Sequence, residues 1–244
     1  MATIVGKTVL VTGAGRGIGR ALAEEAARRG ATRVYAGIRR PAEFSDPRIE
    51  PLAVDVTDPQ QIQRAVARVG DLDVLINNAG VALYDDLSDR SMLEQHLAVN
   101  FFGIYDMTKA FLPLITRSRG AIVNNLSVNA LAPLPLIPAY SISKAAAFNL
   151  TQSLRALLSH HGVRVHAILT GPTDTDMTRG LDIPKATPQS VAAAVFDGLE
   201  ADEDIFPDPI SQSIASSWRT GAAKALERQY AELLAPAAPV AAGD

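Results

Sequence analysis

Short runs of apolar residues alternate along the chain with longer segments in which apolar and polar residues recur at helical spacing. The short runs predict strands at residues 8–11, 33–37, 51–54, 74–76, 121–126 and 163–169. The longer segments predict helices at residues 18–29, 58–69, 91–116 and 140–160. Strands with so few polar positions are expected to be buried on both faces, so the expected fold class is α/β, a single doubly wound parallel β-sheet with helices on both faces.

The C-terminal third of the chain has a less regular pattern. Residues 171–185 contain Gly, Pro, Asp and Thr with little periodicity, which predicts a long functional loop. Thr187 and Pro188 predict a helix start, with the helix running to about residue 200, and residues 203–206 predict a last edge strand. We expect one catalytic domain over residues 1–234 and a flexible Ala/Pro-rich tail at residues 235–244.

The composition argues against several classes of protein. The chain has 244 residues, of which 48% are hydrophobic, and a net charge of −3, which disfavours disorder and gives no reason to expect nucleic acid or anionic membrane as a partner. It has no cysteine, and its four histidines lack metal-ligand spacing, so no metal site is predicted. There is no run of about 18 apolar residues and no signal-like start, so we expect a cytoplasmic protein.

A glycine-rich segment follows the first predicted strand and opens the first predicted helix. Between residues 12 and 19 the chain reads TGAGRGIG. Glycines at such a turn let backbone N–H groups approach a pyrophosphate, which also lies at the positive end of the helix dipole. The segment therefore predicts dinucleotide binding in a Rossmann-type fold. The alternative is a glycine-rich turn with only a structural role.

The end of the second predicted strand favours one nicotinamide dinucleotide over the other. NAD enzymes of this architecture usually carry an acidic residue there, which binds the ribose 2′-hydroxyl. This chain has Ile38, Arg39 and Arg40 and no carboxylate. A guanidinium suits contact with a 2′-phosphate, and Arg16 would add a second positive charge. We therefore predict NADP(H). The alternative is that the arginine pair is a solvated part of the surface.

Tyr140 and Lys144 are four residues apart in a predicted helix and therefore share one helix face. A cation beside a tyrosine stabilises the phenolate, so we expect the pKa of Tyr140 to be lowered toward neutrality, as acid–base catalysis requires. Ser127 follows one predicted strand, and the NNAG segment at residues 77–80 follows another. Because ligands bind at the carboxyl ends of parallel strands, these residues are expected to meet at one edge of the sheet.

Taken together, these motifs resemble those of the short-chain dehydrogenase/reductase family, from about Lys7 to Phe206. They occur in the family's order and at its usual separations, and they include Val99-Asn100 and the loop at Gly171. The resemblance implies a catalytic tetrad of Asn100, Ser127, Tyr140 and Lys144. It also implies a cofactor site that comprises Gly13, Arg16, Gly17, Ile18, Gly19, Arg39, Asp55, Val56, Asn78, Ala79, Gly80, Tyr140, Lys144, Gly171, Thr173 and Thr175.

The resemblance also implies a role for each member of the tetrad. Tyr140 would protonate the nascent alkoxide, and Ser127 would hydrogen-bond the substrate oxygen. Lys144 would hold the nicotinamide ribose, and Asn100 would support a water-linked proton relay. In the cofactor site, Asp55 and Val56 would flank the adenine, residues 78–80 would lie on the adenosine side, and Thr173 and Thr175 would contact the nicotinamide carboxamide.

Three positions depart from the family pattern. Thr170 stands where the family commonly has proline, and Thr173 where it commonly has an aliphatic residue; both lie in the segment that the resemblance places at the nicotinamide. Asn125 occupies a strand position that is usually aliphatic, and a buried asparagine there needs hydrogen-bond partners.

The implied activity is reversible hydride transfer between NADP(H) and a carbonyl or alcohol substrate. Apolar residues around the expected site favour a small hydrophobic ketone, aldehyde or secondary alcohol, unless most of them serve only in packing: Ala82, Leu83, Tyr84, Leu131, Leu134, Leu136, Ile137, Met177 and Leu181. The apolar-striped helices at 91–116 and 140–160 and the family resemblance suggest a homodimer or homotetramer.

Two other functions remain open from the sequence. One is a 3-oxoacyl-[acyl-carrier-protein] reductase, which would need a basic docking patch near the active-site mouth, with Arg117 and Arg119 as candidates. The other is an NADP(H)-sensing regulator without turnover. The Ser127, Tyr140 and Lys144 set argues against a regulator, because a sensor needs no proton donor beside the nicotinamide.

Overall fold

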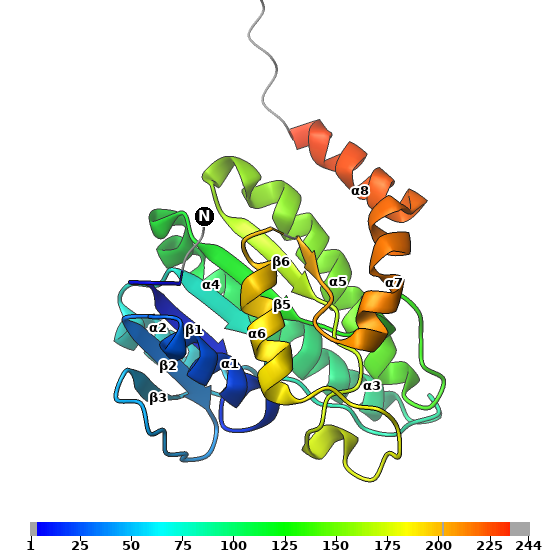
Figure 1. Ribbon diagram of the computed structural model, residues 1–244, viewed down its shortest axis with the longest axis horizontal. Coiled ribbons are helices and arrows are strands. Elements are labelled where there is room, and N and C mark those ends of the chain that lie inside the picture. Colours follow the sequence, from blue (N-terminus) through cyan, green and yellow to red (C-terminus); the bar gives the residue numbers. More distant parts are fainter. Residues whose placement is uncertain (1–3, 202, 235–244) are drawn as a thin grey trace, which may run out of the picture.

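The sheet predicted from the apolar runs is present. A computed structural model describes residues 4–201 and 203–234 of the chain. Its strands pair in parallel in one seven-stranded sheet of order β3-β2-β1-β4-β5-β6-β7 (Figure 1). The strands are β1 Thr8–Thr12, β2 Arg33–Ile38, β3 Ile49–Ala53, β4 Val74–Asn77, β5 Ala121–Asn125, β6 Arg164–Ile168 and β7 Asp204–Ile205.

The strand order reverses between β1 and β4, which creates the crevice where doubly wound sheets bind ligands. The helices are α1 Gly17–Arg28, α2 Pro59–Val69, α3 Arg90–Leu97, α4 Gly103–Ser118, α5 Pro138–Leu158, α6 Pro188–Gly198, α7 Pro209–Thr220 and α8 Ala222–Ala231. Short helical turns are η1 Ala98–Phe102, η2 Val128–Ala130, η3 Ser159–His161, η4 Asp176–Thr178 and η5 Glu232–Leu234.

Alternate strand residues feed two hydrophobic layers, one on each face of the sheet. Val9 and Val11 of β1 pack with residues of α1 and α6, which lie side by side on one face (Figure 1). Leu10, between them, faces the opposite layer and packs with residues of α2 and α4. The strands are therefore covered on both faces, which is why their sequences read as nearly continuous apolar runs.

The helix predicted at residues 91–116 is interrupted. The chain runs from α3 through η1, which is a π-helix, and then into α4. Asn100 lies inside the π-turn. Periodicity did not predict the interruption, because the apolar residues before the π-turn and those after it each keep helical spacing among themselves.

Helices α7 and α8 were not predicted individually, although the start of α7 has a readable signal. Asp208 precedes Pro209, and its carboxylate accepts the Ser211 N–H at 3.0 Å. This is the same arrangement of N-cap and proline that correctly placed the start of α6 at Thr187 and Pro188. The predicted edge strand at 203–206 is present as the two residues of β7.

The expected tail at residues 235–244 lies outside the described residues, and the single domain over residues 1–234 stays a prediction. In the described part of the chain, no helix combines the length and the apolar character needed to cross a bilayer.

Candidate active site and cofactor site

The turn after β1 is packed closely around three of its glycines. A Cβ on Gly13, where φ is +67°, would lie 2.9 Å from Ala79 Cα. A Cβ on Gly19 would lie 2.3 Å from the Gly13 carbonyl oxygen. Gly17 has a φ of +54°, and a Cβ there would lie 3.2 Å from Thr175 Cγ2. The turn is therefore compact, with its backbone close to the segments after β4 and β6.

This turn leaves the N-terminus of α1 available to an anion. The N-cap residue is Arg16, which makes no side-chain cap hydrogen bond, and no acidic residue lies in the first turn. By contrast, α2, α6 and α7 are capped by Asp58, Thr187 and Asp208. Free N–H groups at the positive end of a helix dipole suit a pyrophosphate, so the residues present fit a dinucleotide.

The end of β2 lies against the glycine turn. Ile38 is buried, and its Cγ2 would lie 3.6 Å from a Cβ on Gly15. The side chain of Arg39 is 66% exposed, and its Nη1 lies 3.8 Å from Asp55 Oδ2. Val56, which follows Asp55, is buried. Asp55 and Val56, which were predicted to flank the adenine, therefore follow β3, next to the end of β2, with the solvent-accessible Arg39 guanidinium beside Asp55.

Arg16 is engaged differently from the prediction. Its Nη1 donates to Asp176 Oδ2 at 2.6 Å, which ties the glycine turn to η4 in the loop after β6. Asp176 also pairs with Arg179. The guanidinium of Arg16 is therefore directed to a carboxylate of the chain, and its contact with a 2′-phosphate stays a prediction.

Thr12 joins the glycine turn to the segment after β4. Its hydroxyl accepts the backbone N–H groups of Asn78 and Ala79 at 2.9 and 3.0 Å, and the Asn78 side chain donates to the Thr12 carbonyl at 2.9 Å. Gly80 lies one residue further along. A Cβ on Gly80 would lie 3.2 Å from Asn100 Oδ1 and 3.7 Å from Lys144 Nζ, so this glycine permits the two segments to meet.

Asn100 holds the chain that leaves this segment. Its Oδ1 accepts the Val81 N–H at 2.9 Å, and its Nδ2 donates to the Val81 carbonyl and to Ser143 Oγ, each at 2.9 Å. The side chain is fully buried. Its amide therefore clamps the loop after β4 to α5, while its part in a proton relay stays a prediction.

Ser127, Tyr140 and Lys144 are brought together at the carboxyl end of β5. All three are buried, at 7%, 8% and 4% exposure. Tyr140 is hydrogen-bonded to the Ser127 side chain. Lys144 Nζ lies 5.6 Å from the centre of the Tyr140 ring and donates to the Asn125 carbonyl at 2.8 Å. The hydroxyl, phenol and ammonium groups therefore form one buried cluster beside the glycine turn.

The predicted lowering of the Tyr140 pKa is wrong for this structure. Burial raises the pKa of Tyr140 to about 12, and the hydrogen bond with Ser127 opposes this only in part. Burial also lowers the pKa of Lys144 to about 8. Desolvation is the largest cause of both shifts. Tyr140 is consequently a protonated donor at neutral pH.

The loop after β6 returns over the glycine turn. Gly171 N donates to Asp208 Oδ2 at 2.7 Å, and a Cβ on Gly171 would lie 2.4 Å from the same carboxylate's Oδ1. Thr173 is buried, and its backbone bridges to Ala186. Thr175 packs toward Gly17. The residues predicted to contact the nicotinamide therefore lie next to the glycine turn.

Two buried or half-buried groups near the site were not predicted. His96 is fully buried; its Nε2 accepts the Leu83 N–H at 3.0 Å, and its ring meets that of Tyr140 edge-on at 6.3 Å. Asp85 accepts the Ala139 N–H at the start of α5, at 3.3 Å to each carboxylate oxygen. Asp85 ties the loop after β4 to the start of α5, and His96 ties the same loop to α3 beside the Tyr140 ring. Local sequence carries no signal for such contacts across the fold.

Arg117 and Arg119, the basic patch predicted to dock an acyl carrier protein, do not lie near the active-site mouth. Arg119 directly precedes β5 and Ser127 follows it, so the two lie at opposite ends of the strand. Arg117 pairs with Asp71 at 2.6 Å, just before β4. Because parallel strands all run the same way, both arginines lie at the amino edge of the sheet, away from the active-site mouth.

The sequence is similar to those of known proteins. Residues 7–185 match the short chain dehydrogenase family. Mouse estradiol 17-beta-dehydrogenase 2 is 36% identical over 194 residues, which cover 72% of this chain and 51% of that protein. The oxidoreductase UcpA of Salmonella typhimurium is 35% identical over 216 residues, which cover 80% of this chain and 82% of that protein. The chain thus spans about half the length of the mouse relative and most of the bacterial one.

A solved structure agrees in fold along nearly the whole chain. A short chain dehydrogenase from Burkholderia cenocepacia, crystallised in complex with NADP, superposes with a TM-score of 0.85. It is 37% identical and covers 96% of this chain and 100% of its own. The family match extends over more than half of the sequence. The chain therefore belongs to the short chain dehydrogenase family.

Proposed function

We propose that the protein is an NADP(H)-dependent oxidoreductase that reversibly reduces a hydrophobic ketone or aldehyde to an alcohol, with Tyr140 as the general acid and base. One observation carries the proposal: the buried cluster of Ser127, Tyr140 and Lys144 lies at the carboxyl edge of the sheet, beside the glycine turn. A hydride-transferring enzyme needs a proton donor next to its dinucleotide site, and this cluster supplies one.

The preference for NADP(H) rests on charge. The end of β2 carries Ile38 where an NAD enzyme would present a carboxylate, and the exposed guanidinium of Arg39 follows it. A ribose 2′-phosphate therefore meets a cation and no acidic repulsion from Ile38. The similar structure from Burkholderia cenocepacia, which was solved with NADP, supports the same choice. The uncapped N-terminus of α1 would hold the pyrophosphate.

The chain's own groups manage the proton and the substrate oxygen. The bound nicotinamide supplies the hydride for reduction and takes it up in oxidation. As the carbonyl carbon gains the hydride, Tyr140 gives its proton to the oxygen, and Ser127 hydrogen-bonds that oxygen. The tyrosine left as phenolate is stabilised by the nearby Lys144 ammonium and is reprotonated from solvent. In oxidation, Tyr140 first gives its own proton to solvent, and the phenolate then accepts the proton of the alcohol.

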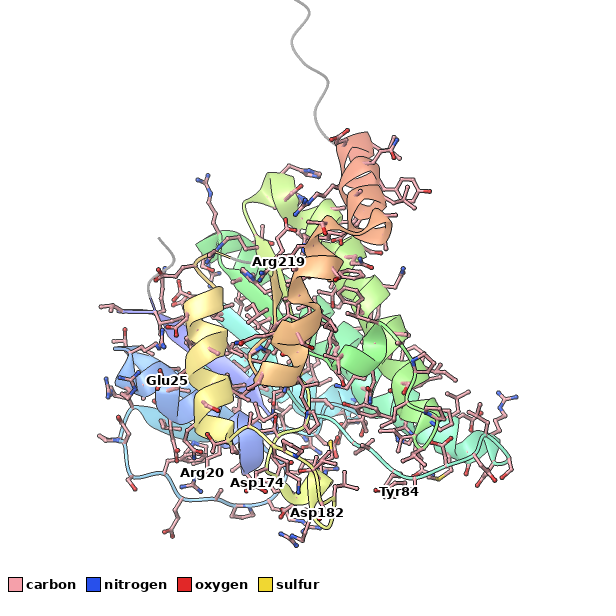
Figure 2. The ribbon with its side chains drawn as sticks, turned by 45° about the vertical axis from the view of Figure 1, so that its right-hand side comes forward. Arg20, Glu25, Tyr84, Asp174, Asp182 and Arg219 are labelled. Atoms are coloured by element: carbon pink, nitrogen blue, oxygen red, sulfur yellow. The ribbon has the colours of Figure 1, made fainter. Side chains whose placement is uncertain are left out.

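The substrate class follows from the loops around this cluster. Leu83, Leu134 and Met177 are 40%, 41% and 49% exposed although they are apolar. They lie on the segments that follow β4, β5 and β6, all of which leave the carboxyl edge of the sheet. Tyr84 and Asp182, on two of these loops, lie along one side of the molecule in Figure 2. An apolar rim of this kind favours a hydrophobic substrate over a strongly charged one.

Exposed apolar side chains on η1, α4 and α5 also support a homodimer or homotetramer as part of this proposal. Phe102 at the end of η1, Tyr105 at the start of α4 and Leu157 near the end of α5 expose 51%, 43% and 52% of their surface. Apolar side chains of this size on long helices are candidates for burial between copies of the chain. Light scattering coupled to size-exclusion chromatography measures the assembly directly. The cytoplasmic location stays a prediction.

A substrate panel tests the proposal. Hydrophobic ketones, aldehydes and secondary alcohols would be tried with NADPH or NADP and with NADH or NAD, and the absorbance of the reduced nicotinamide would be followed. Turnover with NADPH and apolar carbonyl compounds is the expected result. Binding of NADPH without turnover of any panel member would favour the regulator instead. A 3-oxoacyl thioester belongs in the panel, because its selective reduction would point to the acyl-carrier alternative.

A further inference from the structure

A line of polar side chains crosses the carboxyl edge of the four central strands. Its members are Thr12 at the end of β1, Asn78 after β4, Asn125 at the end of β5 and Thr170 after β6. These strands are neighbours in the order β1-β4-β5-β6. Each member is hydrogen-bonded to the next, so the line, called here the polar rung, connects the glycine turn with the segment that leads into the loop at Gly171.

Asn125 is the central link of the polar rung. Its Nδ2 donates to Asn78 Oδ1 at 2.8 Å, and its Oδ1 accepts from Thr170 Oγ1 at 3.2 Å. It is only 7% exposed, so an aliphatic side chain at this position would leave the Asn78 oxygen without its donor in a poorly hydrated place. The contacts explain why an amide is accommodated at the end of a central strand.

Through Asn78, the rung reaches the dinucleotide site. The Asn78 amide donates to the carbonyls of Thr12 and Gly13, at 2.9 and 3.4 Å. It fills the space that a Cβ on Gly19 would enter, 2.4 Å from its Nδ2. With Asn125 donating to its oxygen, the Asn78 amide has a single orientation in which its NH₂ group faces the glycine turn. The backbone of that turn is thereby held in the shape that fits a pyrophosphate.

Through Thr170, the rung reaches the catalytic side. The Thr170 hydroxyl shares its proton between Asn125 Oδ1 and the Leu126 carbonyl, the latter at 3.0 Å. The Thr170 carbonyl accepts the Val128 N–H at 3.0 Å, directly after Ser127. The backbone carbonyl of Asn125 itself accepts from Lys144 Nζ at 2.8 Å. Asn125 therefore contacts both Asn78, which supports the glycine turn, and Lys144, which belongs to the proton-donating cluster.

We infer that Asn125 is a positioning residue that, together with Thr170, sets the affinity for the dinucleotide by holding Asn78 against the glycine turn. This inference rests on the proposed function, since it assumes that NADPH binds at that turn. It also assigns a shared role to two departures from the family pattern: the hydroxyl of Thr170 supplies the donor that Asn125 Oδ1 needs, and a proline at position 170 has no hydroxyl.

A double-mutant cycle on NADPH affinity tests the inference. The dissociation constant would be measured by nicotinamide fluorescence in wild type, Asn125→Val, Thr170→Val and the double variant. Asn125→Val is expected to weaken NADPH about tenfold, and Thr170→Val by about threefold, in line with losing one partner of a buried hydrogen bond. In the Asn125→Val background, Thr170→Val is expected to add less than about twofold, because its partner is already gone.

Two controls separate positioning from general stability. Asn124→Val removes the adjacent asparagine, whose side chain bonds Asn77 and Thr151 instead of the rung; it should lower the melting temperature and leave NADPH affinity within about twofold. Thr170→Ser keeps the hydroxyl and should bind NADPH like wild type. This serine and valine pair also remains informative if Asn125→Val does not fold.

Three results overturn the inference: additive effects in the cycle, an unchanged dissociation constant in Asn125→Val, or an equal loss of affinity in Asn124→Val. Failure of the proposed function looks different, because folded wild type would then either bind no NADPH at all or bind it without turnover of any substrate in the panel. Folding of each variant is checked by thermal unfolding in the absence of cofactor.

Discussion

The Arg16 guanidinium donates to the Asp176 carboxylate across 160 residues of sequence, and this 2.6 Å contact closes the loop after β6 onto the glycine turn. Both partners are accessible to solvent, at 78% and 38% exposure of their side chains, so the pair adds less than about 1 kcal/mol to stability. Its effect is expected in binding, because it competes with a phosphate for the same cation.

Asp176→Asn should therefore strengthen NADPH binding. Loss of the carboxylate frees Arg16 to meet the 2′-phosphate, and a gain of about two- to fivefold is reasonable for an exposed charge. NADH affinity should stay unchanged. Fluorescence titration of both cofactors measures the effect. The same substitution in an Arg16→Ala background is the control, and a gain that survives there would show that Arg16 is not the cause.

Arg39 should decide the preference for the phosphorylated cofactor. Its guanidinium is accessible and lies 3.8 Å from Asp55, too far for a hydrogen bond that would withhold it from a ligand. Arg39→Ala should weaken NADPH about ten- to a hundredfold and barely change NADH. Ile38→Asp should go further, because it adds repulsion and an acceptor for the ribose hydroxyl.

The ratio of kcat/KM for the two cofactors measures both substitutions. A wild type that prefers NADH, or an equal loss for both cofactors in Arg39→Ala, would show that Arg39 is a surface residue without a role in recognition.

Tyr140→Phe should abolish most turnover and leave NADPH affinity nearly intact. The substitution removes the phenolic proton and little of the surface that faces the dinucleotide, and a positioned proton donor contributes on the order of 10²- to 10⁴-fold. Steady-state kinetics and fluorescence titration on the same preparation provide the two readouts. Turnover at the wild-type rate would exclude Tyr140 as the acid.

The strand ends that carry the site were predictable because their sequence signals are local. Apolar runs placed β1, β4, β5 and β6 to within a residue or two, and a parallel sheet brings residues after each strand to a common edge. Ser127 and Tyr140 therefore met as expected. The glycine spacing also predicted a tight turn, and the structure adds that a Cβ on Gly19 would lie 2.3 Å from the Gly13 carbonyl oxygen.

Contacts between segments that are distant in the sequence could not be predicted from local sequence patterns. Nothing around Asp208 indicates that its carboxylate accepts the N–H of Gly171. Likewise, the pKa of Tyr140 depends on how completely the fold excludes water from the phenol, and spacing from Lys144 alone led to the wrong direction. Sequence periodicity reports which face of an element is apolar. It does not report which polar groups meet after packing.

The buried Lys144 ammonium should lower the free energy of unfolding at neutral pH. Burial lowers its pKa to about 8, so the folded protein binds fewer protons than the unfolded chain between pH 8 and the ordinary lysine value of 10.5. The cost of burying the charge is therefore fully present below pH 8 and disappears as the pH rises to 10.5. Lys144→Met removes that cost while it removes the catalytic cation.

The expected gain for Lys144→Met at pH 7 is at most about 3 kcal/mol in the free energy of unfolding. About 1 kcal/mol of it is lost because the Asn125 carbonyl loses its donor. By pH 10.5 the variant should be no more stable than wild type. Urea unfolding at both pH values checks the sign, and a variant that is less stable at pH 7 would contradict it. Activity should be lost at either pH.

A buried ionic cluster should stabilise the C-terminal helices. Asp204 accepts from Arg155 at 2.7 Å, from Lys224 of α8 at 2.9 Å and from the Trp218 indole at 2.8 Å. Burial alone would raise the pKa of Asp204, but Arg155 and Lys224 outweigh it and hold that pKa below its ordinary value. The cluster's contribution is therefore present above about pH 4 and is lost as the pH falls through the lowered value.

Asp204→Asn should reduce the free energy of unfolding by about 3 kcal/mol at pH 7, because it leaves buried cations with one partner fewer. The difference from wild type should shrink below pH 4. Fluorescence of the single tryptophan, Trp218, reports the change locally. A constant difference between pH 7 and pH 3 would show that shape, and not charge, is responsible. NADPH turnover of the folded fraction should be unaffected.

The π-turn at residues 98–102 makes the number of residues between α3 and α4 as important as their identity. Such a turn holds one residue more than a regular one. Each residue of a regular α-helix turns the chain by about 100°, and the π-turn absorbs its surplus residue without turning the face of α4 relative to α3. Deleting one residue of the turn should therefore close it as a regular α-helix that keeps Met107 and Phe111 in the core and displaces Asn100 from Ser143. Such a deletion should damage the site more than the fold, whereas the same deletion inside α4 would turn the rest of that helix by about 100° and expose its apolar face.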